Sequence, residues 1–153
     1  LGAERIIAMG HHEDRLAIAE EFFRADAGIA LTLQLASFGA EIIEAHGSDA
    51  QCEEFLRPVA NNDQITGLAV SEPQTGSDLA GMITSATKDG DEWVINGEKY
   101  WVGNAVEADW LTVYAKTGDD PDNRYGNYSV FIVPTDAPGY QAEHIPEKIG
   151  LRA

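Results

Sequence analysis

Two short segments carry residue types that can bind a phosphate group or a planar ligand. The first, residues 68–78, reads Leu-Ala-Val-Ser-Glu-Pro-Gln-Thr-Gly-Ser-Asp. A strand that ends at Ser71 cannot continue through Pro73, which lacks an amide donor, and Gly76 permits a tight turn. Such a turn exposes backbone amides and the hydroxyls of Ser71 and Ser77, which suit a phosphate or the edge of a heterocycle. From turn chemistry alone, an ordinary exit from a strand into a loop explains these residues better.

The second segment, residues 96–104, reads Asn-Gly-Glu-Lys-Tyr-Trp-Val-Gly-Asn. We expect a tight turn at Asn96-Gly97, followed by a strand that carries Trp101. Gly103 then permits close backbone approach two residues later. An indole stacks on planar ring systems, and a nearby N–H can donate a hydrogen bond to the ring system. Taken alone, Trp101 fits a place in the hydrophobic core better than a ligand site.

Together the two segments resemble the acyl-CoA dehydrogenase family. The family string Thr-Glu-Pro-x-x-Gly-Ser-Asp appears here as residues 71–78, with Ser71 in place of the threonine. The family hairpin Asn-Gly-x-Lys-x-Trp-Ile-Thr-Asn appears as residues 96–104, with Gly103 in place of the threonine. Further similar stretches, which extend the resemblance over essentially the whole chain, are residues 47–56, 90–97, 131–134 and 150–153.

The resemblance implies which residues face an FAD cofactor. In the family, the strand that corresponds to residues 68–71 meets the edge of the flavin ring. The serine that corresponds to Ser77 lies near the FAD pyrophosphate, and the tryptophan that corresponds to Trp101 flanks the isoalloxazine. The implied cofactor-facing residues are Leu68, Val70, Ser71, Gly76, Ser77, Trp101 and Gly103. Because Gly103 lacks the family hydroxyl, one side-chain hydrogen bond to the flavin is lost, worth roughly 0.5–1.5 kcal/mol. Either a water molecule replaces it, or the flavin potential is tuned differently.

The same resemblance implies an acyl-CoA substrate. Ser77 lies near the CoA-bearing substrate in the family, and residues 30–38 align with the helix that lines the acyl tunnel. The implied substrate-facing residues are therefore Ser77, Leu31, Gln34 and Phe38. Plain helix packing explains the last three equally well.

The reaction implied by the resemblance is α,β-dehydrogenation of an acyl-CoA thioester, a step of fatty acid metabolism. A glutamate base removes the α-proton while a hydride passes to FAD N5, and electrons then go to an electron-transfer flavoprotein. That base lies in the family's C-terminal helical domain, which we expect to be absent from this chain. Glu72 fits a turn carboxylate better than a base. The alternatives are an acyl-CoA oxidase, a flavin monooxygenase and a non-catalytic FAD- or CoA-binding module on the same scaffold.

Helices must position the first part of the chain. Apolar spacing predicts an amphipathic helix over residues 13–24. Asp26 can cap a second helix that runs to about His46, before a Gly47 stop. A Ser-x-x-Gln capping box then opens a short helix that ends near Pro58. We therefore expect residues 1–62 to be part of an α-helical bundle.

Strands must position both chemical segments. Runs of β-branched and aromatic residues predict strands over residues 65–71, 82–88, 92–95, 99–102, 110–116, 128–134 and 140–145. Tight turns at Asp89-Gly90 and Asn96-Gly97 indicate a three-strand meander. The fold class is therefore α+β, with a small antiparallel β-barrel or sandwich domain over residues 63–153.

Composition limits the partners. The chain of 153 residues carries 10 Lys and Arg against 26 Asp and Glu, a net charge of −16, which disfavours nucleic acid and anionic membranes. No apolar run is long enough to span a membrane, and the single cysteine, Cys52, suits the reducing cytoplasm. The histidines lack metal-ligand spacing. The acidity favours adaptation to high salt over a merely acidic mesophilic protein. The first residues look like the middle of a longer protein, which we expect to be a homodimer or homotetramer.

Overall fold

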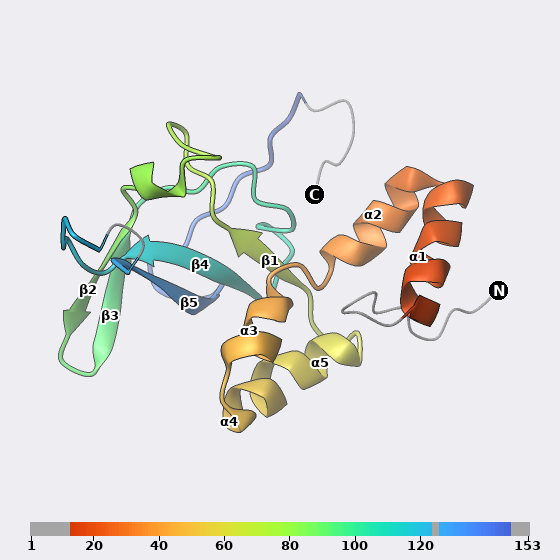
Figure 1. Ribbon diagram of the computed structural model, residues 1–153, viewed down its shortest axis with the longest axis horizontal. Helices are drawn as coiled ribbons and strands as arrows, with labels where there is room; N and C mark the ends of the chain where they lie inside the picture. Colours follow the sequence, from red (N-terminus) through yellow and green to blue (C-terminus); the bar gives the residue numbers. More distant parts are fainter. Residues whose placement is uncertain (1–12, 124–125, 148–153) are drawn as a thin grey trace.

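Helices precede strands along the chain (Figure 1). The computed structural model describes residues 13–123 and 126–147. The helical elements are α1 (Glu13–Ala25), α2 (Ala27–Leu35), α3 (Ala40–His46), α4 (Asp49–Gln51), the wider π-helical turn η1 (Cys52–Leu56), α5 (Arg57–Ala60) and the 3₁₀ turn η2 (Leu79–Gly81). The strands are β1 (Thr66–Ala69), β2 (Ser85–Asp89), β3 (Glu92–Asn96), β4 (Trp110–Lys116) and β5 (Tyr128–Pro134).

The helix predicted from Asp26 to about His46 is two helices. Asp26 caps α2 as predicted, because its carboxylate accepts a hydrogen bond from the Ile29 amide at 3.0 Å. The chain then breaks at Gly39, whose φ of 99° is left-handed. The Thr112 hydroxyl donates to the Gly39 carbonyl at 3.0 Å, and a Cβ at Gly39 would lie 2.6 Å from that hydroxyl. Close contact with the sheet therefore ends α2 and starts α3 in a new direction.

The capping box at Ser48 is confirmed. The Gln51 amide donates to the Ser48 hydroxyl at 3.3 Å, and the Ser48 amide donates to the Gln51 side chain at 2.9 Å. The helical segment continues past Pro58 to Ala60, because the wider turn η1 precedes the proline and changes the regular hydrogen-bond ladder that proline would interrupt. In Figure 1, α1 and α2 lie apart from the group of α3, α4 and α5. The helices therefore contact one another in two groups.

The sheet is open and mixed, so the predicted closed antiparallel barrel or sandwich is wrong for the described residues. The strand order is β1-β4-β2-β3, and β5 also pairs with β4. β1 pairs with residues 110–113 of β4 and β2 with Lys116, whereas β5 pairs along the whole strand. β1 runs parallel to β4, whereas β5 runs antiparallel to it. β4 is the central strand, and five of its seven residues are buried, as expected of a strand with neighbours on both edges.

Only one of the two predicted tight turns forms a hairpin. Asp89-Gly90 joins β2 to β3, with Asp89 opposite Glu92. Residues 97–102 and 140–145 form no strand, so the predicted three-strand meander is wrong. At Gly97 the backbone lies so close to Thr84 that a Cβ would come within 2.4 Å of its hydroxyl. This close approach takes the chain out of the sheet after β3.

Two apolar clusters hold the layers together on opposite sides of β4. One joins the helices to the sheet and contains Ala40, Ile43, Val59 and Trp110. The other, which contains Ala69, Ala108, Leu111 and Val113, lies beneath the second chemical segment. Successive residues of a strand point to opposite faces, so Trp110 and Leu111 serve different clusters.

A substitution at Gly67 tests how closely β1 and the second segment approach. A Cβ at Gly67 would lie 2.4 Å from the Gly103 carbonyl oxygen. We expect Gly67→Ala to reduce the free energy of unfolding by about 1–3 kcal/mol, the usual cost of overpacking. Gly76→Ala is the control, since a Cβ there meets no atom within 4 Å. Urea unfolding followed by tryptophan fluorescence measures both, and equal stabilities would contradict the packing described here.

Candidate functional site

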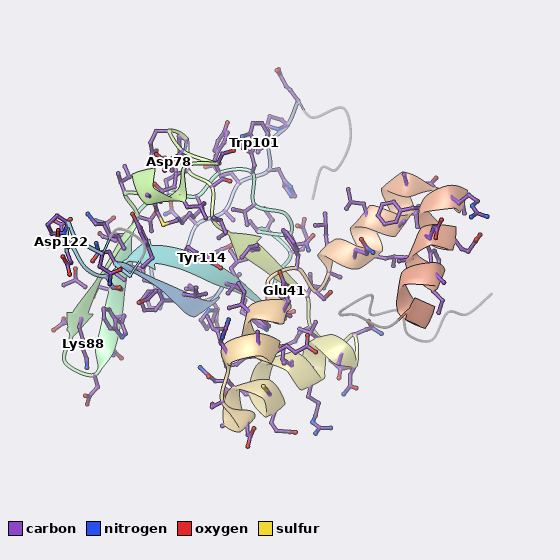
Figure 2. All side chains as sticks on the ribbon, viewed as in Figure 1. Glu41, Asp78, Lys88, Trp101, Tyr114 and Asp122 are labelled. Carbon is purple, nitrogen blue, oxygen red and sulfur yellow. The ribbon has the colours of Figure 1, made fainter. Side chains whose placement is uncertain are left out.

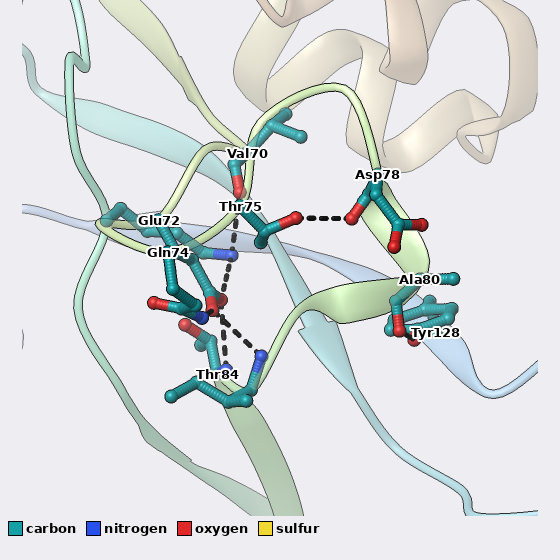
Figure 3. Close-up of polar contacts among 10 residues, drawn as sticks. Val70, Glu72, Gln74, Thr75, Asp78, Ala80, Thr84 and Tyr128 are labelled. Atoms are coloured by element: carbon teal, nitrogen blue, oxygen red, sulfur yellow. Dashed lines mark hydrogen bonds and ion pairs between the residues drawn. The ribbon is translucent and has the colours of Figure 1, made fainter.

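A buried ion pair joins the two chemical segments, and its carboxylate, Glu72, is labelled in Figure 3. Glu72 Oε1 lies 2.9 Å from Lys99 Nζ, and the two side chains are only 1% and 10% exposed. Lys99 Nζ also donates to the Val70 carbonyl at 3.0 Å. One residue further along, the Tyr100 amide donates to the Ser71 carbonyl at 2.8 Å. Three consecutive residues of the first segment are thereby fixed against two of the second.

The Glu72 carboxylate is fully engaged in holding the chain. Beside Lys99, it accepts hydrogen bonds from the Ile83 amide at 2.8 Å, the Thr84 amide at 2.9 Å and the Gln74 side chain at 2.6 Å. Burial opposes ionisation of Glu72, but the hydrogen bonds from Ile83, Thr84 and Lys99 outweigh it and lower its pKa to about 2. Because the amides of residues 83 and 84 donate to Glu72, β2 begins only at Ser85 rather than at the predicted Met82.

Lys99 is the buried cation of the pair. Burial lowers the pKa of its ammonium group, and the neighbouring Glu72 carboxylate opposes that effect. An unpaired charge at this depth would be costly, so the lysine and the carboxylate depend on each other.

The turn after the first strand closes on itself and presents its outer end to solvent. Glu72 and Thr75 exchange backbone hydrogen bonds of 2.8 and 3.1 Å, and the Thr75 hydroxyl donates to the Asp78 carbonyl. Gly76 and Ser77 follow at the exposed tip of this turn. The Ser77 hydroxyl therefore lies on a surface that a phosphate group can reach.

Trp101 is neither on a strand nor in the core, so both sequence-based placements are wrong. Its φ of 60° is left-handed, which costs a residue with a side chain roughly 1–2 kcal/mol. The residue is 60% exposed, and its ring meets the Tyr100 ring edge to face at 4.7 Å. Figure 2 shows Trp101 and Asp78 on the same side of the sheet, away from Lys88 in the β2–β3 hairpin.

Asn104 anchors the far end of the second segment. It is buried, has a φ of 63°, and its side-chain amide donates to the Leu35 carbonyl at 2.7 Å and the Thr66 carbonyl at 3.1 Å. The half-buried Gly103 lies directly before it, with its carbonyl against Gly67. This turn therefore ties the end of α2 to the start of β1.

Some of the predicted cofactor-facing residues lie on neighbouring stretches of the chain. Leu68 is in β1, and Val70 and Ser71 follow it half-buried. The Ser71 carbonyl accepts a hydrogen bond from the amide of Tyr100, the residue directly before Trp101. Their contact with a flavin remains a prediction.

The predicted substrate-facing residues of the helix lie close to this region. Leu31 and Gln34 are half-buried in α2, and Phe38 is 44% exposed just beyond its end. The hydrogen bond that joins α2 to the second segment is donated by the Asn104 side-chain amide to the Leu35 carbonyl, and Leu35 lies between the predicted positions. Their role toward an acyl chain also remains a prediction.

Sequence reasoning missed a groove of about 860 Å³ beside Trp101. Its walls are the second segment on one side and residues 137–146 on the other. The Tyr140 hydroxyl donates to the Ala105 carbonyl at 2.5 Å, and His144 lies 3.5 Å from the Glu107 carboxylate. Burial raises the pKa of Tyr140. Of the predicted site residues, Trp101 alone lines the groove, and no local motif in residues 137–146 indicated that they would form its second wall.

Two other kinds of site have no support within the described part of the chain. Residues 13–123 and 126–147 contain no cluster of three or more His, Cys, Asp or Glu side chains that could hold a metal ion. No helix among the same residues is long and apolar enough to cross a membrane. Cys52 is half-buried, and its thiol lies 3.7 Å from the Ile43 carbonyl.

The ionised Glu72 predicts an acid-sensitive fold. Because its pKa falls from the usual 4.5 to about 2 on folding, its stabilisation is complete above pH 4.5 and lost as the pH falls toward 2. The full loss is roughly 3–3.5 kcal/mol in the free energy of unfolding. We expect Glu72→Gln to be less stable at neutral pH and to lose less stability between pH 5 and pH 3. Glu53→Gln, whose carboxylate is 65% exposed beside Arg57, is the control and should follow the parent. Urea unfolding measures all three, and equal acid losses in parent and Glu72→Gln would contradict the assignment.

Comparison with known proteins places this site in a family. Residues 8–63 match the family profile described as acyl-CoA dehydrogenase, N-terminal domain, and residues 67–153 match the one described as acyl-CoA dehydrogenase, middle domain. The mitochondrial short-chain specific acyl-CoA dehydrogenase of Rattus norvegicus is 34% identical over 129 residues, which are 84% of this chain and 31% of the rat protein.

Solved structures agree with the sequence matches. A glutaryl-CoA dehydrogenase from Mycobacterium smegmatis in complex with FADH2 aligns with a TM-score of 0.80 and 33% identity, covering 97% of this chain and 39% of that one. The prolyl acyl carrier protein oxidase AnaB aligns with a TM-score of 0.73 and 29% identity, covering 82% and 33%. The chain thus spans about a third of the length of these relatives. Since the middle-domain match alone covers more than half of its residues, the chain belongs to the acyl-CoA dehydrogenase family of FAD-dependent oxidoreductases.

Proposed function

We propose that this chain supplies the flavin-facing part of an enzyme that oxidises acyl-CoA thioesters between their α and β carbons. The observation that carries the proposal is the exposed indole of Trp101, which directly follows Tyr100, the residue whose amide donates to the Ser71 carbonyl. Strained backbone conformations cluster at ligand sites, and Trp101 combines such a conformation with an exposed side chain, which supports a ligand as its partner.

The residues present fit an FAD cofactor. The flavin ring is planar, and the exposed indole of Trp101 offers it a stacking surface. The hydroxyl and amides at the exposed Gly76-Ser77 tip suit the pyrophosphate. Gly103 leaves its backbone open to close approach, since the nearest atom to a Cβ there is 3.8 Å away on Leu35. When bound, FAD supplies the hydride acceptor of the reaction.

The catalytic base is proposed to be a glutamate outside these 153 residues. Glu72 cannot serve as the base, because its buried carboxylate already accepts four hydrogen bonds and its pKa is lowered to about 2. A general base needs an accessible oxygen within reach of the substrate proton. The chain spans about a third of its relatives' length, which leaves room elsewhere in the protein for such a residue.

We further propose that residues 1–62 and 63–153 belong to separate domains of an oligomeric protein, a homodimer or homotetramer. Acyl-CoA is the proposed substrate and an electron-transfer flavoprotein the proposed electron acceptor. Oxygen is the alternative acceptor, which the similarity to an acyl carrier protein oxidase favours.

Anaerobic titration of the full-length protein with a panel of acyl-CoA thioesters tests the proposal. We expect at least one thioester to bleach the flavin absorbance, and Trp101→Ala to weaken FAD binding about 2- to 10-fold, as the loss of one aromatic stack predicts. Trp93→Ala is the control, because Trp93 is also exposed but its ring packs edge to face against Phe131 of β5. Failure of every thioester to bleach the flavin would overturn the proposal. Rapid aerobic reoxidation with release of hydrogen peroxide would instead indicate an oxidase.

A further inference from the structure

We propose that Glu72 and Lys99 are positioning residues that set the orientation of Trp101 toward the flavin. The inference rests on the proposed function for the identity of the ligand. It concerns a different question, namely how an indole that is largely in solvent keeps one orientation. Neither residue contacts the reacting atoms in this account, so each acts through the backbone of the second segment.

Packing against neighbouring residues does not orient Trp101. The residue is 60% exposed, and its recorded ring contact is with the neighbouring Tyr100, itself 38% exposed. A side chain with so few neighbours takes its direction from its backbone. At φ 60° that backbone is in a conformation that needs support from both sides.

Two anchors support the left-handed backbone at Trp101. On the far side, buried Asn104 is tied to Leu35 and Thr66. On the near side, Lys99, which lies two residues before Trp101, donates hydrogen bonds to Val70 and Glu72. The three residues between Tyr100 and Asn104 bridge the anchors, so their path depends on where Lys99 is held.

The near anchor, Lys99, depends on the charge of its ammonium group. The Lys99 ammonium is 10% exposed and donates to one carboxylate and one carbonyl, a geometry that an apolar side chain cannot reproduce. The Tyr100 amide donates a further hydrogen bond from the second segment to the first, at the Ser71 carbonyl. Loss of the lysine ammonium therefore removes two of the hydrogen bonds that hold the start of the bridge.

A spectroscopic measurement on the full-length apoprotein isolates Trp101. In a Trp93→Phe background, Trp101 is exposed and Trp110 is 2% exposed, so acrylamide quenching and fast fluorescence depolarisation within residues 13–147 report mainly on Trp101. The signal of a Trp93→Phe/Trp101→Phe variant is subtracted from that of Trp93→Phe. The difference comes from Trp101 and excludes any tryptophan elsewhere in the full-length protein. The readout needs neither FAD nor substrate.

We expect Lys99→Met to raise the amplitude of the fast depolarisation at least twofold, and Lys99→Arg to restore most of the parent value because it keeps the charge. In the FAD-loaded protein, Lys99→Met should weaken FAD binding severalfold. Lys116→Met is the matched control, since Lys116 pairs with the exposed Asp119 on the surface, and it should match the parent.

Unchanged depolarisation in a folded Lys99→Met variant would overturn the inference and leave only a structural role for the pair. If that variant does not fold, Glu72→Gln/Lys99→Met replaces it, because it removes both charges and leaves none unpaired. That double variant should show the same increased depolarisation, and a parent-like value would again overturn the inference. If the parent binds no FAD, the proposed function fails, while the apoprotein measurement still decides the positioning role.

Discussion

Glu72 accepts four hydrogen bonds from three separate parts of the chain, and the geometry around the proposed site depends on them. Two of its donors are the amides just before β2, a third is Gln74 in its own turn, and the fourth is Lys99 in the second segment. One buried carboxylate thus fixes where β2 begins, how the turn closes and where the second segment runs. Each of these consequences follows from satisfying a single buried charge.

This use of a carboxylate also shows why an acidic residue in a functional motif need not be catalytic. A base must be accessible and able to take a proton near neutral pH, whereas Glu72 is buried and holds its charge far into the acid range. Its charge is matched by a lysine rather than by solvent. The chemistry that this part of the protein can offer is therefore binding and orientation, through exposed groups such as Trp101 and Ser77.

Sequence patterns predicted what depends on neighbours along the chain. The cap at Asp26, the capping box at Ser48 and the bounds of β4 and β5 are as predicted, because each follows from short-range propensity or continuous apolar character. They failed where distant contacts decide. The break at Gly39 depends on Thr112, and the path after Gly97 depends on Thr84.

The candidate site divides in the same way. The two motifs identified the family, and the turn that exposes Ser77 follows from its own residues. The exposure of Trp101 could not be predicted from its own residues, because an aromatic residue after an apparent hairpin is usually a core residue. Its place is set by Lys99 and Asn104, whose partners lie 27 and 69 residues away along the chain. No local pattern contains that information.

A double-mutant cycle in urea unfolding tests the central claim most directly, with Glu72→Gln, Lys99→Met and the two combined. The pair is buried and shares one hydrogen bond of 2.9 Å, so the account predicts a coupling free energy of about 1–3 kcal/mol. The losses in free energy of unfolding of the two single variants should sum to more than the loss of the double variant, because each single variant leaves one buried group unpaired. Additive effects within about 0.3 kcal/mol would contradict the claim that this ion pair holds the two segments together.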